Sequence, residues 1–113
     1  DPRRRAGFER IGELGRLGKK ALLQGDWERL GELMNENHRL TDELVGAGEV
    51  NNRLIAAALK AGALGAKLSG AGRGGTIIAL HPDPDWMGAK LLEAGAERLI
   101  YLKPVPGVTV ERI

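Results

Sequence analysis

A glycine-rich stretch is the part of the sequence that could most directly do chemistry. Residues 70–75 read Gly-Ala-Gly-Arg-Gly-Gly and match the pattern G-x-G-x-x-G. Glycines allow positive φ angles and leave consecutive backbone amides uncovered, so such a stretch can form a concave site for an anion such as phosphate. The same pattern also occurs in turns that only let another backbone pack closely, and composition alone leaves both interpretations open.

The residues on either side narrow the kind of loop. Ala66–Ser69 and Thr76–Leu80 are short, and the second is rich in β-branched residues, which predicts a strand on each side of the glycines. A dinucleotide-binding loop requires a helix after the glycines, and a Walker A loop requires a Gly-Lys-Ser/Thr triplet. A protein-kinase glycine loop would be followed by catalytic motifs that this sequence lacks.

Three other candidates for chemistry lie outside the glycine stretch. Lys67 on the first predicted strand could reach a phosphate, or could discourage pairing at a strand edge. His38 has Asp42 at helical spacing and is expected to pair with it at the surface, the alternative being that it faces a substrate cleft. His81–Asp85, His-Pro-Asp-Pro-Asp, predicts a turn and a helix cap rather than a metal site. No catalytic residue and no metal ligand is therefore assigned from these residues.

Periodic apolar residues predict the elements that carry these groups. Helices are expected over 5–23, 27–45 and 50–61, with Gly25-Asp26 as a break and a cap between the first two and with Trp27 and Met34 in the core. After the glycine loop we expect a helix that stops at Gly95, and strands over 98–102 and 108–113 around a turn at 104–107. The order predicts an α+β fold, a helical segment followed by a small antiparallel sheet covered on one face by helices.

Composition limits the class of protein. The 113 residues fit one domain, with an N-terminal helix over 1–25 and helices plus sheet over 26–113. No apolar run reaches the ~20 residues of a membrane span, and the absence of cysteine and of a signal-peptide pattern predicts a cytoplasmic location. Net charge is +2 with 4% aromatic residues, so the basic residues near the start are expected to face solvent rather than nucleic acid.

The longer sequence around the glycines resembles a known family. "GALGAKLSGAGRGGTIIAL", Gly62–Leu80, is similar to the C-terminal glycine-rich motif of the GHMP kinases, named for galactokinase, homoserine kinase, mevalonate kinase and phosphomevalonate kinase. "LMNENHRLTDEL", Leu33–Leu44, and "AALKAGALGAKLSG", Ala57–Gly70, look most like the mevalonate kinase branch. The resemblance covers about Trp27–Ile100 and implies the ferredoxin-like C-terminal domain of that family.

The resemblance also implies roles for the loop. It places a loop beside the ATP phosphates and the acceptor alcohol, made of Ser69, Gly70, Ala71, Gly72, Arg73, Gly74 and Gly75. Ala71 would lie nearest the acceptor. Arg73 stands where the family usually has glycine, and it could contact a phosphate or point outward into solvent.

The family's other parts are expected elsewhere. Its main ATP-binding motif is not found in these residues, so ATP and Mg²⁺ would be bound mainly by an N-terminal kinase half. The chain begins with Asp1-Pro2, and we expect it to be the C-terminal part of a longer kinase, inactive alone, with mevalonate as first candidate substrate and self-association through its first helix as a further option. The alternatives are another GHMP kinase that acts on a sugar or a phosphorylated alcohol, and a non-catalytic α+β module that binds a ligand or a protein.

Overall fold

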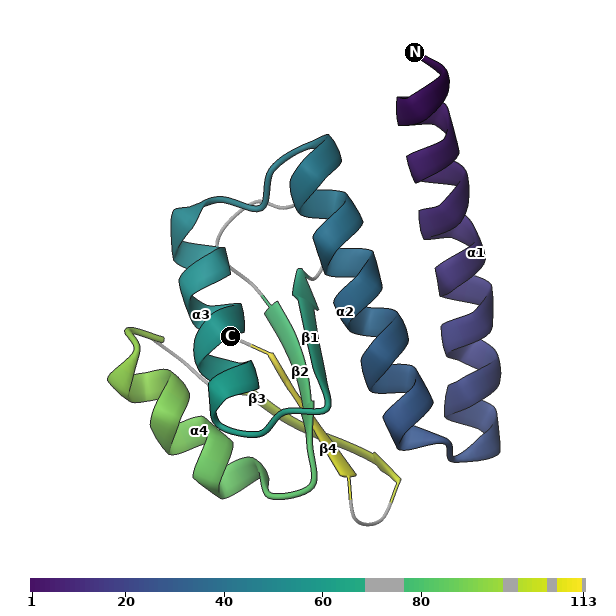
Figure 1. Cartoon of the computed structure of the whole chain (residues 1–113). Helices are drawn as coiled ribbons and strands as arrows, with labels where there is room; N and C mark the ends of the chain where they lie inside the picture. The colour runs from purple at the N-terminus through teal and green to yellow at the C-terminus, as the bar shows by residue number, and fades with distance from the viewer. Residues whose placement is uncertain (69–76, 97–99, 106–107, 113) are drawn as a thin grey trace.

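The order of helices and strands agrees with the one expected from the sequence, and the α+β class is confirmed. The structure, a computed structural model, describes residues 1–68, 77–96, 100–105 and 108–112, the last two ranges by their backbone. Within these ranges three helices, two strands, a further helix and two strands follow one another (Figure 1). Their bounds are α1 (Pro2–Gln24), α2 (Trp27–Leu44), α3 (Glu49–Lys60), β1 (Gly65–Leu68), β2 (Ile77–His81), α4 (Pro84–Glu93), β3 (Ile100–Val105) and β4 (Val108–Arg112).

Gly25 and Asp26 separate α1 from α2, as expected. Gly25 has φ 69°, a left-handed conformation that ends α1 at little cost only when the residue is glycine. The Asp26 carboxylate accepts a hydrogen bond of 3.1 Å from the backbone N–H of Arg29 and so caps α2. The two helices lie side by side (Figure 1), and the Arg10 guanidinium holds the Glu36 carboxylate through bonds of 2.7 and 3.0 Å.

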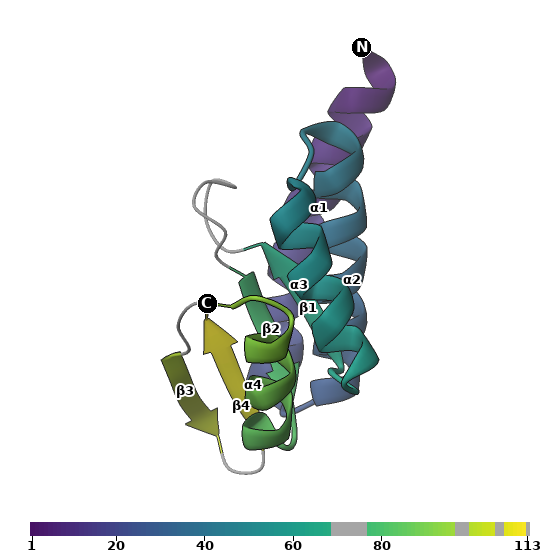
Figure 2. The same ribbon diagram turned by 90° about the vertical axis from the view of Figure 1, so that its left-hand side faces the viewer.

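The sheet is antiparallel, with strand order β1-β2-β4-β3. Successive residues of a strand face opposite sides, so Ile77 and Ala79 share one face of β2. This face packs against the apolar sides of α3 and α4, through Leu54, Ile55, Ala58, Met87 and Leu91. The strands β4 and β3 form the half of the sheet that lies away from the α1–α2 hairpin, with β3 at the edge (Figure 2).

The expectation that helices cover only one face of the sheet is wrong at β1 and β2. Leu80 is fully buried on the second face of β2, where it forms a cluster with Met34 of α2. Ile78 and Trp27 are partly buried against this pair. Because β2 is apolar on both of its faces, it needs a helix layer on each side, and the α1–α2 hairpin supplies the second layer (Figure 1). Trp27 and Met34 belong to the core, as predicted.

The strand β3 also departs from the expectation at its end. The sequence predicts Pro104 and Val105 in a turn, but both belong to β3. The pairing with β4 shifts register between Leu102 and Val105. A proline has no backbone N–H to donate to a neighbouring strand, so strands tolerate proline mainly at a sheet edge or where the pairing is irregular. Pro104 meets both conditions, because β3 is an edge strand and its register shifts at this point.

Candidate functional site

The two strands that carry the glycine loop are paired up to its ends. In the register of β1 with β2 the last pair is Leu68 with Ile77. The predicted loop residues lie outside the described part of the chain; they are Ser69, Gly70, Ala71, Gly72, Arg73, Gly74 and Gly75. The described part of the site is the support of the loop, called the platform below, which consists of β1, β2 and the helix α2 that packs against β1.

Asn35 of α2 fixes the outer edge of β1. Its side-chain Oδ1 accepts a hydrogen bond of 3.0 Å from the backbone N–H of Ala66, and its Nδ2 donates one of 3.3 Å to the carbonyl of Leu64. The Ala66 N–H faces away from β2, and because β1 lies at the edge of the sheet, no further strand lies on that side to accept its hydrogen bond. A single amide side chain thus takes the place of a missing strand neighbour and fixes the position of β1 before the loop.

Two glycines allow α2 to approach β1 so closely. A Cβ atom built on Gly31 would lie 2.3 Å from the carbonyl oxygen of Leu64, and one built on Gly65 would lie 2.4 Å from the carbonyl oxygen of Gly31. Both obstacles are backbone atoms, which cannot move aside as a flexible side chain can. The close contact of helix and strand therefore requires glycine at both positions.

Lys67 places a positive charge directly before the loop. Its ammonium donates a hydrogen bond of 2.9 Å to the carbonyl of Leu68, the last described residue of β1. The side chain faces α1 and α2, where it lines a cavity of about 170 Å³ together with Leu14, Met34 and Asn37. Burial removes part of its hydration and lowers the pKa of Lys67 below that of an exposed lysine. The Lys67 side chain thus lies over the face of the sheet that α1 and α2 cover, and at Ala66 the outer edge of β1 is covered by Asn35.

The sequence predicts that His38 pairs with Asp42, but the two side chains are not directly bonded. Its Nε2 lies 2.8 Å from Oδ1 of Asn52 on α3, and Nδ2 of Asn52 donates a bond of 3.1 Å to Asp42. Since the Asn52 oxygen faces the ring, this network assigns the proton to Nε2. Asp42 also accepts a bond from the backbone N–H of Ala47, which is the main reason that the pKa of Asp42 lies below its usual value. The expected pair is therefore a bridge that joins α2 to α3.

The buried Nδ1 of His38 has no hydrogen-bond partner within the described ranges. The two expected site residues do not share a hydrogen-bond network. Lys67 on β1 bonds to Leu68, whereas His38 on α2 bonds to Asn52. The helices that carry His38 and Asn52 flank the connection over 45–48. Asp42 holds this connection in place by accepting the hydrogen bond from the backbone N–H of Ala47.

The stretch His81–Asp85 forms a turn and a cap, as predicted. Asp83 accepts a hydrogen bond of 3.2 Å from the backbone N–H of Trp86 and caps α4. His81 is buried, with Nε2 at 2.8 Å from the carbonyl of Ala61 and Nδ1 accepting from the N–H of Asp83. Among the described residues, no group of three His, Cys, Asp or Glu side chains could hold a metal ion. None of the described helices combines the length and apolar composition that crossing a membrane requires.

Sequence reasoning missed Asn35, Asn52 and the glycine pair. The available signal was the row Gly31, Asn35, His38 and Asp42, whose spacing of three and four residues places small or polar groups along one side of α2. A row of this kind beside an apolar stripe indicates a second contact surface.

Comparison with known proteins connects this platform to a family. A family model for the C-terminal part of the GHMP kinases matches residues 19–105. The mevalonate kinase of Pyrococcus abyssi is 41% identical over 86 residues, which are 75% of this chain and 26% of that protein. The mevalonate kinase of Thermococcus gammatolerans is 53% identical over 57 residues, 50% of this chain and 17% of that protein.

Two further matches widen the picture. The galactokinase of Thermococcus kodakarensis is 40% identical over 91 residues, 78% of this chain and 24% of that protein. The crystal structure of L. major mevalonate kinase in complex with R-mevalonate superposes with a TM-score of 0.67 at 30% identity, over 94% of this chain and 32% of that one. The chain thus spans about a quarter or less of the length of these curated relatives.

Proposed function

Because this chain belongs to the GHMP kinase family through its C-terminal domain, we propose that it is the C-terminal part of an ATP-dependent kinase that phosphorylates the hydroxyl group of mevalonate, a step towards isoprenoids. The observation that carries the proposal is the glycine-rich motif of the family between two paired strands. The pairing of β1 with β2 extends to Leu68 and Ile77, and Asn35 fixes the outer edge of β1. Phosphoryl transfer depends mainly on positioning and on charge stabilisation, and backbone amides carried between these two strands would serve both.

The loop Ser69–Gly75 is proposed to close beside the ATP phosphates and the acceptor, with Ala71 nearest the acceptor alcohol. Arg73 is proposed to point outward and to tolerate the turn. Lys67, whose ammonium lies at the carbonyl of Leu68 directly before the loop, is proposed to attract a phosphate. His38 is the second residue proposed for the substrate site; its Nδ1, buried in this domain, has no hydrogen-bond partner among the described residues.

ATP and Mg²⁺ belong to the proposal rather than to the described site. Mg²⁺ would neutralise phosphate charge during transfer, but the described residues offer no cluster of carboxylates or imidazoles that fits the ion. From the family resemblance we place both groups mainly on an N-terminal kinase half, which is proposed as the principal partner of this domain. The contribution of this chain is to hold the loop, to exclude water around it and to orient the acceptor. A cytoplasmic location and self-association through α1 complete the proposal.

A second candidate within the family is a sugar kinase. The galactokinase of Thermococcus kodakarensis matches 91 residues at 40% identity, against 86 residues at 41% for the mevalonate kinase of Pyrococcus abyssi and 57 residues at 53% for that of Thermococcus gammatolerans. A non-catalytic binding module is the alternative from another class, and the two classes differ in whether the complete polypeptide consumes ATP.

The test is ADP release with magnesium-ATP by the polypeptide encoded by the complete reading frame. Mevalonate, phosphomevalonate, galactose and homoserine are offered in separate reactions, and the 113-residue chain is assayed in parallel. We expect turnover of mevalonate by the complete polypeptide and none by the chain alone. Turnover of galactose instead would establish the second candidate, and turnover by the chain alone would refute the assignment of the ATP site to another half.

A further inference from the structure

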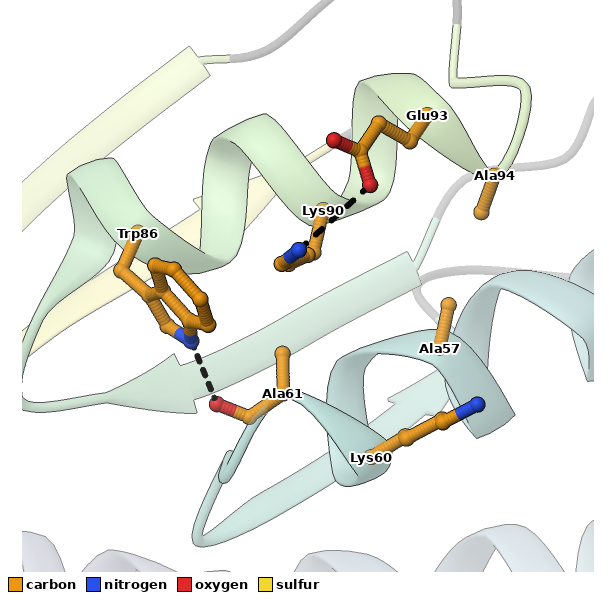
Figure 3. A pocket seen from close by; sticks show the side chains of 7 residues that line it. All are labelled: Ala57, Lys60, Ala61, Trp86, Lys90, Glu93 and Ala94. Atoms are coloured by element: carbon orange, nitrogen blue, oxygen red, sulfur yellow. Dashed lines mark hydrogen bonds and ion pairs between the residues drawn. The ribbon is translucent and has the colours of Figure 1, made fainter.

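A groove between α3 and α4 has the features of a second, separate ligand site. Its volume is about 370 Å³, within the ~300–1,000 Å³ that small-molecule sites usually span. Residues of both helices and of the turns that follow them line it: Ala57, Lys60, Ala61, Trp86, Lys90, Glu93 and Ala94 (Figure 3). It lies on the α3–α4 side of the sheet, whereas Lys67 faces the α1–α2 side.

The apolar part of the groove consists of small side chains beside one aromatic ring. Ala57, Ala61 and Ala94 contribute only methyl groups, and the indole of Trp86, 51% exposed, stands beside them (Figure 3). The only polar atom of this indole is already used, because Nε1–H donates a bond of 3.2 Å to the carbonyl of Ala61. The bond fixes the orientation of the ring, so what the ring offers to a ligand is aromatic surface.

The charged part of the groove favours an anion. The ammonium of Lys90 lies 4.6 Å from the centre of the Trp86 ring and 3.6 Å from the Glu93 carboxylate. Lys60 also lines the groove, from α3, so the groove is lined by two lysines and one glutamate. An incoming anion would find Lys60 and would compete with Glu93 for Lys90.

We propose that this groove binds a small organic anion with a flat apolar body, such as an aryl carboxylate. The apolar body lies on the alanine methyl groups beside Trp86, and the anionic group is held by Lys60 and Lys90. This binding is separate from phosphoryl transfer and does not depend on the proposed kinase function. Its physical basis is the burial of apolar surface together with two charge-assisted contacts.

The probe for the test is 2-naphthoate, added to the ¹⁵N-labelled 113-residue chain, with the indole N–H signals of its two tryptophans followed by NMR. Trp27 serves as an internal control because it lies in the cluster between α2 and β2 and does not line the groove. We expect a saturable shift of the Trp86 signal with little change in that of Trp27. The uncharged 2-naphthalenemethanol should bind more weakly.

Charge variants test the assignment of the anion. Lys60→Met and Lys90→Met keep the aliphatic stem and should each weaken binding about two- to fivefold, the range of an exposed charge pair. Glu93→Gln removes the competing carboxylate and should tighten binding, whereas Lys19→Met on α1 should leave it unchanged. Equal binding of the uncharged analogue, equal shifts of both indole signals, or no saturable shift would each overturn the proposal.

Discussion

Replacement of Gly31 by alanine should destabilise the domain strongly, although it adds only one methyl group. A Cβ atom at this position would lie 2.3 Å from the carbonyl oxygen of Leu64, whereas ordinary contacts begin at 3.4 Å, so α2 must move by about 1 Å. Such a shift costs roughly 1–3 kcal/mol as overpacking and weakens the two hydrogen bonds of Asn35 to β1, each worth about 1 kcal/mol. If both bonds are lost, and alanine regains about 1 kcal/mol of helix propensity, the net loss is about 3 kcal/mol.

The matched control is Gly15→Ala on α1. A Cβ atom at Gly15 would meet nothing within 4 Å, so this change should stabilise the chain by about 0.5–1 kcal/mol. Thermal unfolding followed by circular dichroism should show a fall in Tm of about 10 °C for Gly31→Ala and a small rise for Gly15→Ala. The reasoning is refuted if both variants unfold at the same temperature or if Gly31→Ala is the more stable.

Three further predictions concern pH and the loop. Hydrogen bonds hold the pKa of Asp42 below its unfolded value, so the carboxylate stabilises the fold near neutral pH. This contribution is lost as pH falls through the folded pKa. Asp42→Asn should therefore have a lower Tm than wild type at neutral pH and the same Tm in strong acid. Burial lowers the pKa of Lys67, so wild type should gain stability as pH rises from the folded pKa towards the unfolded value of about 10.4, and Lys67→Met, followed by urea unfolding, should lack this gain. Arg73→Gly in the complete polypeptide should keep kcat and KM for ATP unchanged if the side chain points outward, and a rise in KM for ATP would instead place it at a phosphate.

Local signals predicted the elements of this fold well. Gly25 and Asp26 mark a helix end and a helix start through their own backbone and side-chain chemistry, and Asp83 caps α4 for the same reason. These features depend on a few neighbouring residues. The family predicted from the motif over Gly62–Leu80 is also confirmed.

Contacts between distant segments were harder to predict. The helical spacing favoured Asp42 as the partner of His38, but Asn52, which follows on the next helix, lies between them in the network. The burial of β2 on both faces was visible as the unbroken apolar run over 77–80, which a strand with one exposed face would interrupt with polar residues. The row that contains Asn35 indicated a second contact surface on α2, but no local signal identified the edge of β1 as its partner.

The most direct test of the central claim compares wild type with Gly72→Val in the complete polypeptide, with initial rates of ADP release measured at saturating magnesium-ATP and mevalonate. If the glycine loop supplies backbone amides to the transferring phosphate, the valine side chain should lower kcat by at least about tenfold, while Tm changes little. Equal kcat values for the two proteins would contradict the role assigned to the loop.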